Sequence, residues 1–164
     1  MLKWIWLSVI VLVLDLVTKA YASDQLTLHQ PVPMFPGFNF TLMHNTGAAF
    51  SFLSEASGWQ RWFFSIIAIG VSAGIVVWLK RLATNQVWTA VALALILGGA
   101  LGNVWDRLTL GYVVDFIQVY YDRWYWPAFN IADSAISVGA VILIIDSFRT
   151  ARDEKNPSSE EVRH

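Results

Sequence analysis

Four long apolar runs divide the chain, and each has the length of a helix that crosses a membrane. A hydrocarbon core about 30 Å thick needs about 20 mostly apolar residues in helical conformation. The second and third runs contain no charged residue, and Pro127 suits the first turn of the fourth helix, where a missing N–H leaves no bond unmade. The predicted spans cover about residues 4–22, 62–79, 87–105 and 127–145.

The composition indicates a chain that folds in lipid rather than in water. Of its 164 residues, 56% are hydrophobic and 14% are charged, whereas a soluble domain carries about 25% charged residues. Nine of the 23 charged residues lie from Asp146 onward, which leaves few for the rest of the chain. These proportions exclude a disordered chain, a nucleic-acid-binding protein with a basic surface and an ordinary water-soluble enzyme.

The first run also fits a second interpretation, that of a cleaved signal peptide. Lys3 would be its charged start, residues 4–14 its apolar core and Ala20-Tyr21-Ala22 its cleavage signal. Asp15 and Lys19 argue against this interpretation because charges fit poorly in such a peptide. Four residues apart on one helix face, they can pair, which favours a membrane span.

The positions of lysine and arginine predict the orientation of the spans, because cytoplasmic loops are enriched in these residues. None lies between Lys19 and Arg61, whereas Lys3, the Lys80-Arg81 pair and the C-terminal tail are basic. We therefore expect both termini to be cytoplasmic and the connections 23–60 and 106–126 to face outward.

The fold class predicted from these patterns is an all-α integral membrane protein with four transmembrane helices and a small extracytoplasmic cap rich in β-strand. Residues 38–42 alternate apolar and polar side chains, which is typical of a strand, and the cap is expected over residues 23–58. We expect one membrane-embedded domain, residues 1–152, and a polar cytoplasmic tail, residues 153–164. The patterns Gly70-x-x-x-Gly74 and Gly98-x-x-x-Gly102 indicate close helix packing.

Polar residues inside apolar segments indicate function, because an ionisable group at the bilayer centre costs roughly 2.5 to 3.5 kcal/mol to insert. Asp133 lies six residues after Pro127, which would place it about 9 Å inside the outer end of the fourth helix. The other polar positions also lie toward outer ends of the spans or in an outward connection, so we expect them to converge there. These positions are Asp15, Lys19, Asn103, Arg107, Asp115 and Asn130.

Asp115 and Asp133 would form an acid–base pair if the fold brings them together. Two carboxyl groups in one site cannot both ionise cheaply and therefore share a proton. One can then act as a base on water while the other polarises a carbonyl group, as in aspartic proteases. The alternative is structural, with Asp133 bonding across helices and Asp115 capping a turn, and the spacing of the two residues does not decide between them.

Five segments, in order along nearly the whole chain, resemble the signature blocks of lipoprotein signal peptidase, the signal peptidase II family. Each block is weakly specific by itself, and together they are highly specific. The blocks are residues 15–19 (DLVTK), 45–51 (NTGAAFS), 98–107 (GGALGNVWDR), 113–116 (VVDF) and 129–133 (FNIAD).

This resemblance implies an aspartic endopeptidase of the bacterial inner (cytoplasmic) membrane with its active site near the outer, periplasmic face. Its substrate would be a prolipoprotein that is cut before a Cys carrying diacylglyceryl, in contact with membrane lipid, and globomycin would be expected to inhibit. Asp115 and Asp133 would be the catalytic pair, and the first span would stay uncleaved. The residues that would line or support the site are Asn45, Asn103, Arg107, Asn130, Asp15 and Lys19.

Two functions without catalysis remain as alternatives. A small proton-coupled transporter component would use Asp15, Lys19 and Asp133 as a relay, but it would require charges through the full bilayer depth, and the inner ends of the second and third spans carry none. A membrane scaffold gives no reason for polar residues to converge outside. We expect no cofactor and no metal, because the chain has no Cys and its three His lie far apart.

Overall fold

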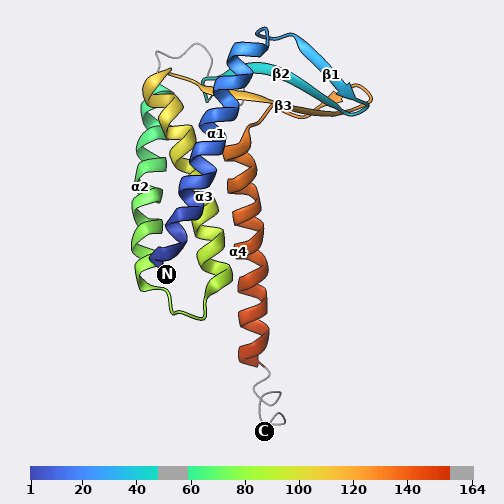
Figure 1. Ribbon diagram of the computed structural model, residues 1–164. Coiled ribbons are helices and arrows are strands. Elements are labelled where there is room, and N and C mark those ends of the chain that lie inside the picture. Colours follow the sequence, from blue (N-terminus) through green and yellow to red (C-terminus); the bar gives the residue numbers. More distant parts are fainter. Residues whose placement is uncertain (48–58, 156–164) are drawn as a thin grey trace.

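The computed structural model describes residues 1–47 and 59–155, and within these ranges four helices form a bundle (Figure 1). Each helix is long and apolar enough to cross a membrane, in agreement with the four predicted spans. A short 3₁₀ turn, Leu2–Trp4, precedes the first helix. The helices are α1 (Ile5–Gln25), α2 (Trp59–Arg81), α3 (Val87–Thr109) and α4 (Ile131–Lys155).

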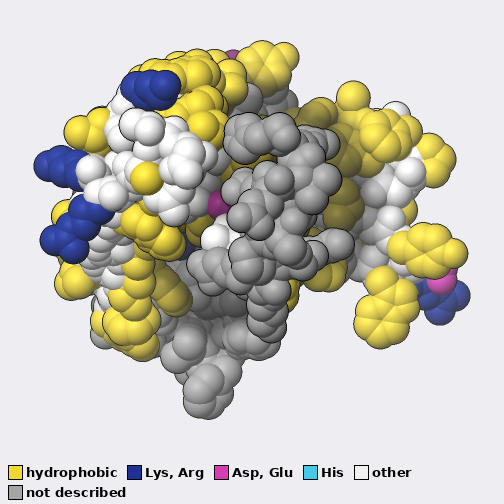
Figure 2. All heavy atoms as spheres, turned by 90° about the horizontal axis from the view of Figure 1, so that it is seen from below, with side chains coloured by type: hydrophobic (Ala, Val, Ile, Leu, Met, Phe, Trp, Pro, Cys, Tyr) yellow, Lys and Arg dark blue, Asp and Glu magenta, His cyan; other side chains and the backbone are white. Residues whose placement is uncertain are grey.

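Helix α3 is the centre of the bundle and packs against the other three helices. Two-thirds of its apolar span is buried, compared with 28% or less of the span in each of the other helices. The outward faces of α1, α2 and α4 carry large apolar side chains such as Val17, Ile66 and Phe148, which are more than half exposed. A view from the end that holds both termini shows apolar side chains around the bundle and basic side chains at its edge (Figure 2). Such a surface suits lipid.

A four-stranded antiparallel sheet lies at the end of the bundle opposite the start of α1 and the C-terminal end of α4 (Figure 1). It is built from two hairpins, one from each of the connections that were expected to face outward. The strands, in both chain and spatial order, are β1 (Pro31–Phe35), β2 (Phe38–Asn45), β3 (Val113–Tyr121) and β4 (Trp124–Tyr125).

The predicted β-rich segment is present as an antiparallel sheet, but two of its four strands lie outside residues 23–58, where the cap was expected. Residues 113–116 of β3 are all buried, because this end of the strand crosses the top of the helices. A strand buried on both faces lacks the apolar–polar alternation that reveals a half-buried strand. Residues 48–58 of the expected cap, which include part of the 45–51 block, and residues 156–164 of the expected tail lie outside the described residues.

The fourth helix begins at Ile131, and the expected start at Pro127 is wrong. Pro127 lies in the segment between β4 and α4. The side-chain oxygen of Asn130 accepts a hydrogen bond from the Asp133 N–H at 2.8 Å, which is the bond that an N-terminal capping residue makes. Asp133 consequently lies in the first turn of α4 rather than about 9 Å inside the helix.

Close helix packing occurs at one of the two predicted glycine patterns. A Cβ atom on Gly98 would lie 2.6 Å from the carbonyl oxygen of Ser8, and one on Gly102 would meet the carboxylate of Asp15, so α1 and α3 approach most closely at positions that lack a side chain. Among the described residues nothing lies within 4 Å of the corresponding position on Gly70 or Gly74. The packing prediction is therefore wrong for the α2 pattern.

The glycine contacts predict opposite effects of alanine at the two patterns. Gly98→Ala should lower the Tm by several degrees, because separating α1 from α3 costs about 1 to 3 kcal/mol of overpacking. Gly70→Ala is the matched control and should leave the Tm unchanged or slightly higher, because alanine favours helix by up to about 1 kcal/mol. The measurement is thermal unfolding of both variants in the same detergent, and equal shifts would contradict the packing assignment.

Candidate active site

The buried ammonium group of Lys19 is the centre of a polar cluster beneath the sheet. Its Nζ lies 2.7 Å from Oδ2 of Asp15 and 3.0 Å from Oδ2 of Asp106. It also donates a hydrogen bond of 3.1 Å to Oδ1 of Asn103. Lys19 is 3% exposed and Asp15 is fully buried, so the predicted pairing of these two residues is confirmed. A buried ammonium group is tolerated here because each of its three donors has a partner.

Asp106 is a further member of this cluster, and it was not among the site residues predicted from the sequence. Its carboxylate pairs with Lys19 and accepts a hydrogen bond of 3.0 Å from the backbone N–H of Val114 in β3. It therefore ties α3 to the sheet. A signal for this role was present in the sequence, because Asp106 is next to Arg107 within the 98–107 block and directly follows an uncharged span.

Asn130, the capping residue of α4, joins the strand β3 to the helices. Its side-chain amide group donates hydrogen bonds to Oδ1 of Asp115 at 2.7 Å and to Oδ1 of Asn103 at 3.2 Å. Its side-chain oxygen holds the backbone N–H of Asp133, as described above. A single fully buried side chain thus contacts both predicted catalytic residues.

The two carboxyl groups are held by separate amides. Asn45 at the end of β2 donates to Oδ2 of Asp115 at 2.9 Å, so both oxygens of that carboxyl group accept an amide N–H. Asn103 on α3 donates to Oδ1 of Asp133 at 2.7 Å. Asp115 is 1% exposed, whereas Asp133 is half-buried. Strand β3 and helix α4 therefore bring one deeply buried and one accessible carboxyl group into the same network.

Arg107 lies at the margin of the network on the side of α2. Its guanidinium group lies 5.6 Å from the centre of the Phe64 ring, and Nη1 donates to the backbone oxygen of Asn103 at 3.3 Å. It forms no salt bridge with a carboxylate of the described residues, although its charge acts on Asp133 and Asp115. All eight predicted site residues are thus in contact with one another or with this network at the sheet end of the bundle.

Burial raises the pKa of the Asp115 carboxyl group from its ordinary value of 3.8 to about 7. The hydrogen bonds from Asn45 and Asn130 oppose this shift, and the neighbouring charge of Asp133 adds to it. A carboxyl group with such a pKa is about half protonated at neutral pH, and its protonated form can donate a hydrogen bond to an oxygen atom. The site therefore holds the elements of acid–base catalysis. No cluster of metal-ligating side chains occurs among residues 1–47 and 59–155.

The fold and the site define a multi-pass membrane protein with a carboxyl-containing polar centre at one end of its helical bundle. The family model for signal peptidase II (SPase II) matches residues 7–149. The chain belongs to this family and is a protease of the aspartic, signal peptidase II type.

Known relatives resemble the chain over almost its whole length. A lipoprotein signal peptidase of Pseudomonas aeruginosa is 58% identical over 153 residues, which cover 92% of this chain and 90% of that protein. A lipoprotein signal peptidase of Pseudomonas putida is 57% identical over 155 residues, 93% of this chain and 91% of that protein. A bacterial membrane enzyme whose structure was determined in meso at 2.3 Å resolution superposes with a TM-score of 0.81 at 33% identity, covering 99% of this chain and 96% of that one. A second such structure, at 1.9 Å, gives 0.77 at 34% identity, covering 88% and 92%.

Removing the ammonium group of Lys19 should destabilise the protein strongly. Lys19→Met would leave Asp15 and Asp106 buried without a cation, which costs about 3 to 5 kcal/mol. We expect a fall in Tm of about 10 °C, measured by thermal unfolding, and partial recovery when Asp15→Asn and Asp106→Asn are added. Lys80→Met, at the exposed end of α2, is the control. If Lys19→Met lowered the Tm no more than Lys80→Met does, the central role of Lys19 would be refuted.

The raised pKa of Asp115 predicts that the stability difference between wild type and Asp115→Asn depends on pH. Between about pH 4 and pH 7 the folded state binds a proton that the unfolded state releases, so this group's contribution to stability falls as the pH rises through that window and levels off above it. Asp115→Asn removes the contribution. The Tm of the variant relative to wild type should therefore increase by about 5 to 10 °C from pH 5 to pH 8. Asp122→Asn, in the exposed turn after β3, controls for loss of a surface carboxyl group, and a pH-independent difference for Asp115→Asn would exclude the shifted pKa.

Proposed function

We propose that this chain is an intramembrane aspartic endopeptidase that removes signal peptides from diacylglyceryl-modified bacterial prolipoproteins. It would cut before the lipidated Cys. The observation that carries the proposal is the placement of Asp115 and Asp133 around the same buried amide, Asn130, at the sheet end of a bundle of membrane helices. The names of the Pseudomonas relatives support the substrate class.

In the proposed mechanism, Asp115 is the protonated member of the pair and Asp133 is the base. Asp133 takes a proton from water, whose oxygen attacks the scissile carbonyl carbon, while the Asp115 proton is donated in a hydrogen bond to the carbonyl oxygen. The tetrahedral intermediate collapses when Asp133 returns its proton to the leaving amine, and Asp115 keeps its own. The raised pKa of Asp115 and its deep burial support this division of roles.

The supporting residues would keep the two carboxyl groups in different environments. Asn45 and Asn130 fix the orientation of Asp115, and Asn103 fixes that of Asp133. Asp15 and Lys19 would hold Asn103 and the start of α4 in place beneath them. Arg107 would face the substrate backbone beside the pair. No cofactor enters this mechanism.

The proposed orientation places both termini in the cytoplasm and the active site near the periplasmic face of the inner membrane. The basic residues at the end that carries the termini support it through the enrichment of such residues in cytoplasmic loops (Figure 2). A substrate anchored by diacylglyceryl in the outer leaflet would then present its scissile bond at the level of the first turn of α4. Membrane lipid and a globomycin-type inhibitor would be further partners of this site.

The transporter alternative is not favoured by the arrangement of charges. A proton relay requires ionisable groups at intervals through the bilayer. Four buried charged residues, Asp15, Lys19, Asp106 and Asp115, gather instead at the sheet end. Helix α4 carries no ionisable residue between Asp133 and Asp146.

Substitution of either carboxyl group tests the proposal. Asp115→Asn and Asp133→Asn should each reduce cleavage of a diacylglyceryl-modified prolipoprotein by at least about 100-fold, because each removes one partner of the acid–base pair. Release of the signal peptide by purified protein in lipid is the measurement, and thermal unfolding checks that both variants are folded. Asp122→Asn should cleave at the wild-type rate, and full activity of either pair variant would exclude the pair.

A further inference from the structure

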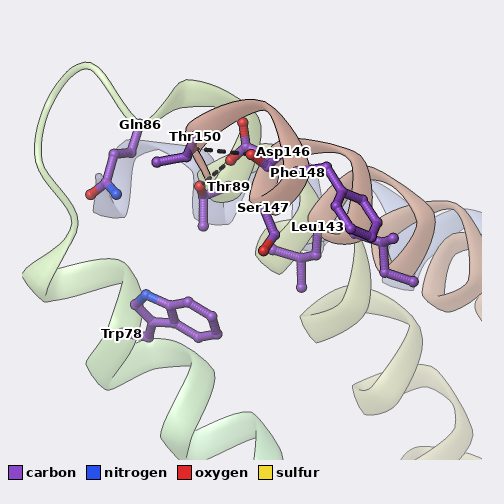
Figure 3. A pocket seen from close by; sticks show the side chains of 9 residues that line it. Trp78, Gln86, Thr89, Leu143, Asp146, Ser147, Phe148 and Thr150 are labelled. Atoms are coloured by element: carbon purple, nitrogen blue, oxygen red, sulfur yellow. Dashed lines mark hydrogen bonds between the residues drawn. The ribbon is translucent and has the colours of Figure 1, made fainter. Parts of the chain in front are cut away.

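The end of the bundle opposite the candidate active site contains a pocket of about 680 Å³. It lies between the end of α2, the start of α3 and the C-terminal part of α4 (Figure 3). We call it the inner pocket, and the mechanism proposed above does not use it. Residues that line it include Trp78, Gln86, Thr89, Leu143, Asp146 and Phe148.

The distinctive group of the inner pocket is the carboxylate of Asp146. Its Oδ2 accepts a hydrogen bond of 2.6 Å from the hydroxyl group of Thr89, which fixes the side chain against α3 (Figure 3). Among the described side chains no lysine, arginine or histidine forms a salt bridge with it. An ionised carboxylate at the end of a membrane span is unfavourable unless a cation or water reaches it. The pocket therefore suits a positively charged group.

Asp146 and the candidate catalytic pair lie on the same helix at a defined separation. Asp146 lies thirteen positions after Asp133, which is about 20 Å along α4 at 1.5 Å per residue. At both points a side chain of α3 bonds to the carboxylate of α4, Asn103 to Asp133 and Thr89 to Asp146. The seam between α3 and α4 thus carries one accessible carboxyl group near each end.

A signal peptide has matching chemistry at a matching distance. It begins with a positively charged region, continues with an apolar region of 7 to 15 residues and ends at the cleavage site. A helical apolar region of about 13 residues spans about 20 Å. When its cleavage site lies at Asp133, the charged region that precedes it lies at the level of Asp146.

We propose that the inner pocket binds the cationic N-terminal region of the substrate's signal peptide through Asp146, held by Thr89. This inference rests on the proposed function and adds a second recognition point, remote from the cleavage site. Lys80, Arg81 and Arg149 belong to the same end of the bundle and weaken the attraction for a cation. The expected effect is therefore several-fold rather than several hundred-fold.

The test compares two diacylglyceryl-modified prolipoprotein substrates that differ only in the N-terminal region, which carries two lysines in one and two glutamines in the other. The full-length protein is reconstituted in phosphatidylcholine bilayers, which have no net charge that could attract the lysines. Wild type should cleave the lysine substrate with a kcat/KM about three- to tenfold higher, mainly through KM. In Asp146→Asn this ratio should fall to about one. Asn keeps a side-chain oxygen that can accept the hydrogen bond from the Thr89 hydroxyl group. The substitution therefore removes the negative charge and leaves this hydrogen bond in place.

Three further arms and one control separate recognition from a structural role. Asp146→Glu should retain the preference for the lysine substrate. Asp146→Lys should prefer a third substrate, in which two glutamates replace the two lysines of the N-terminal region. A lysine substrate whose apolar region is longer by six residues, about 9 Å of helix, should lose its advantage with wild type. Asp122→Asn, remote from the inner pocket, should keep the wild-type ratio.

The possible failures are distinguishable. Equal cleavage of both substrates by wild type, or an unchanged ratio in Asp146→Asn, would overturn this inference alone. Equal loss of activity on both substrates in Asp146→Asn would assign Asp146 a purely structural role and would also overturn it. Failure of wild type to cleave either substrate would overturn the proposed function together with this inference.

Discussion

The structure of the site depends on one buried positive charge, the ammonium group of Lys19. It neutralises Asp15 and Asp106, and each carboxylate also holds a backbone N–H of another element: Ala132 at the start of α4 and Val114 in β3. Three helices and the sheet are therefore joined through a single side chain. In a bilayer such a network is stable only when every member has a partner, so it also fixes the start of α4 against α1 and the strand β3 against α3.

Asn130 links this network of ion pairs to the two carboxyl groups of the candidate active site. As the capping residue it ends the irregular segment after β4 and starts α4. With its amide group it orients Asp115, and Asn103, which contacts the same amide, orients Asp133. The same side chain sets the helix boundary and the spacing of the two carboxyl groups. Deep burial of Asp115 raises the pKa of its carboxyl group, so this member of the pair binds a proton more tightly than a carboxyl group in water.

The distribution of polar groups along the bundle agrees with a substrate that stays in the membrane. The outward faces of α1, α2 and α4 carry many large apolar side chains. The carboxyl groups of α4 lie toward its two ends, with the proposed catalytic Asp133 beneath the sheet and Asp146 at the inner pocket. A protease with this layout would hold a membrane-spanning signal peptide by its ends. The apolar middle needs no specific contact, because lipid and side chains solvate it equally well.

The sequence by itself predicted the four membrane helices, the pairing of Asp15 with Lys19 and the polar residues that gather at the candidate site, because apolar length, helical spacing and five ordered signature blocks are all local properties of the chain. The tertiary structure decided the rest. Strand β3 could not be recognised, since burial on both faces removes its alternation. The ion pair of Asp106 with Lys19 depends on how α1 packs against α3, which no local pattern reveals. The start of α4 moved from Pro127 to Ile131 because the Asn130 cap and the contact of Asp15 with Ala132 override a favourable proline. Gly98 packs and Gly70 does not, because a glycine pattern permits close approach but only the arrangement of the helices supplies a neighbour.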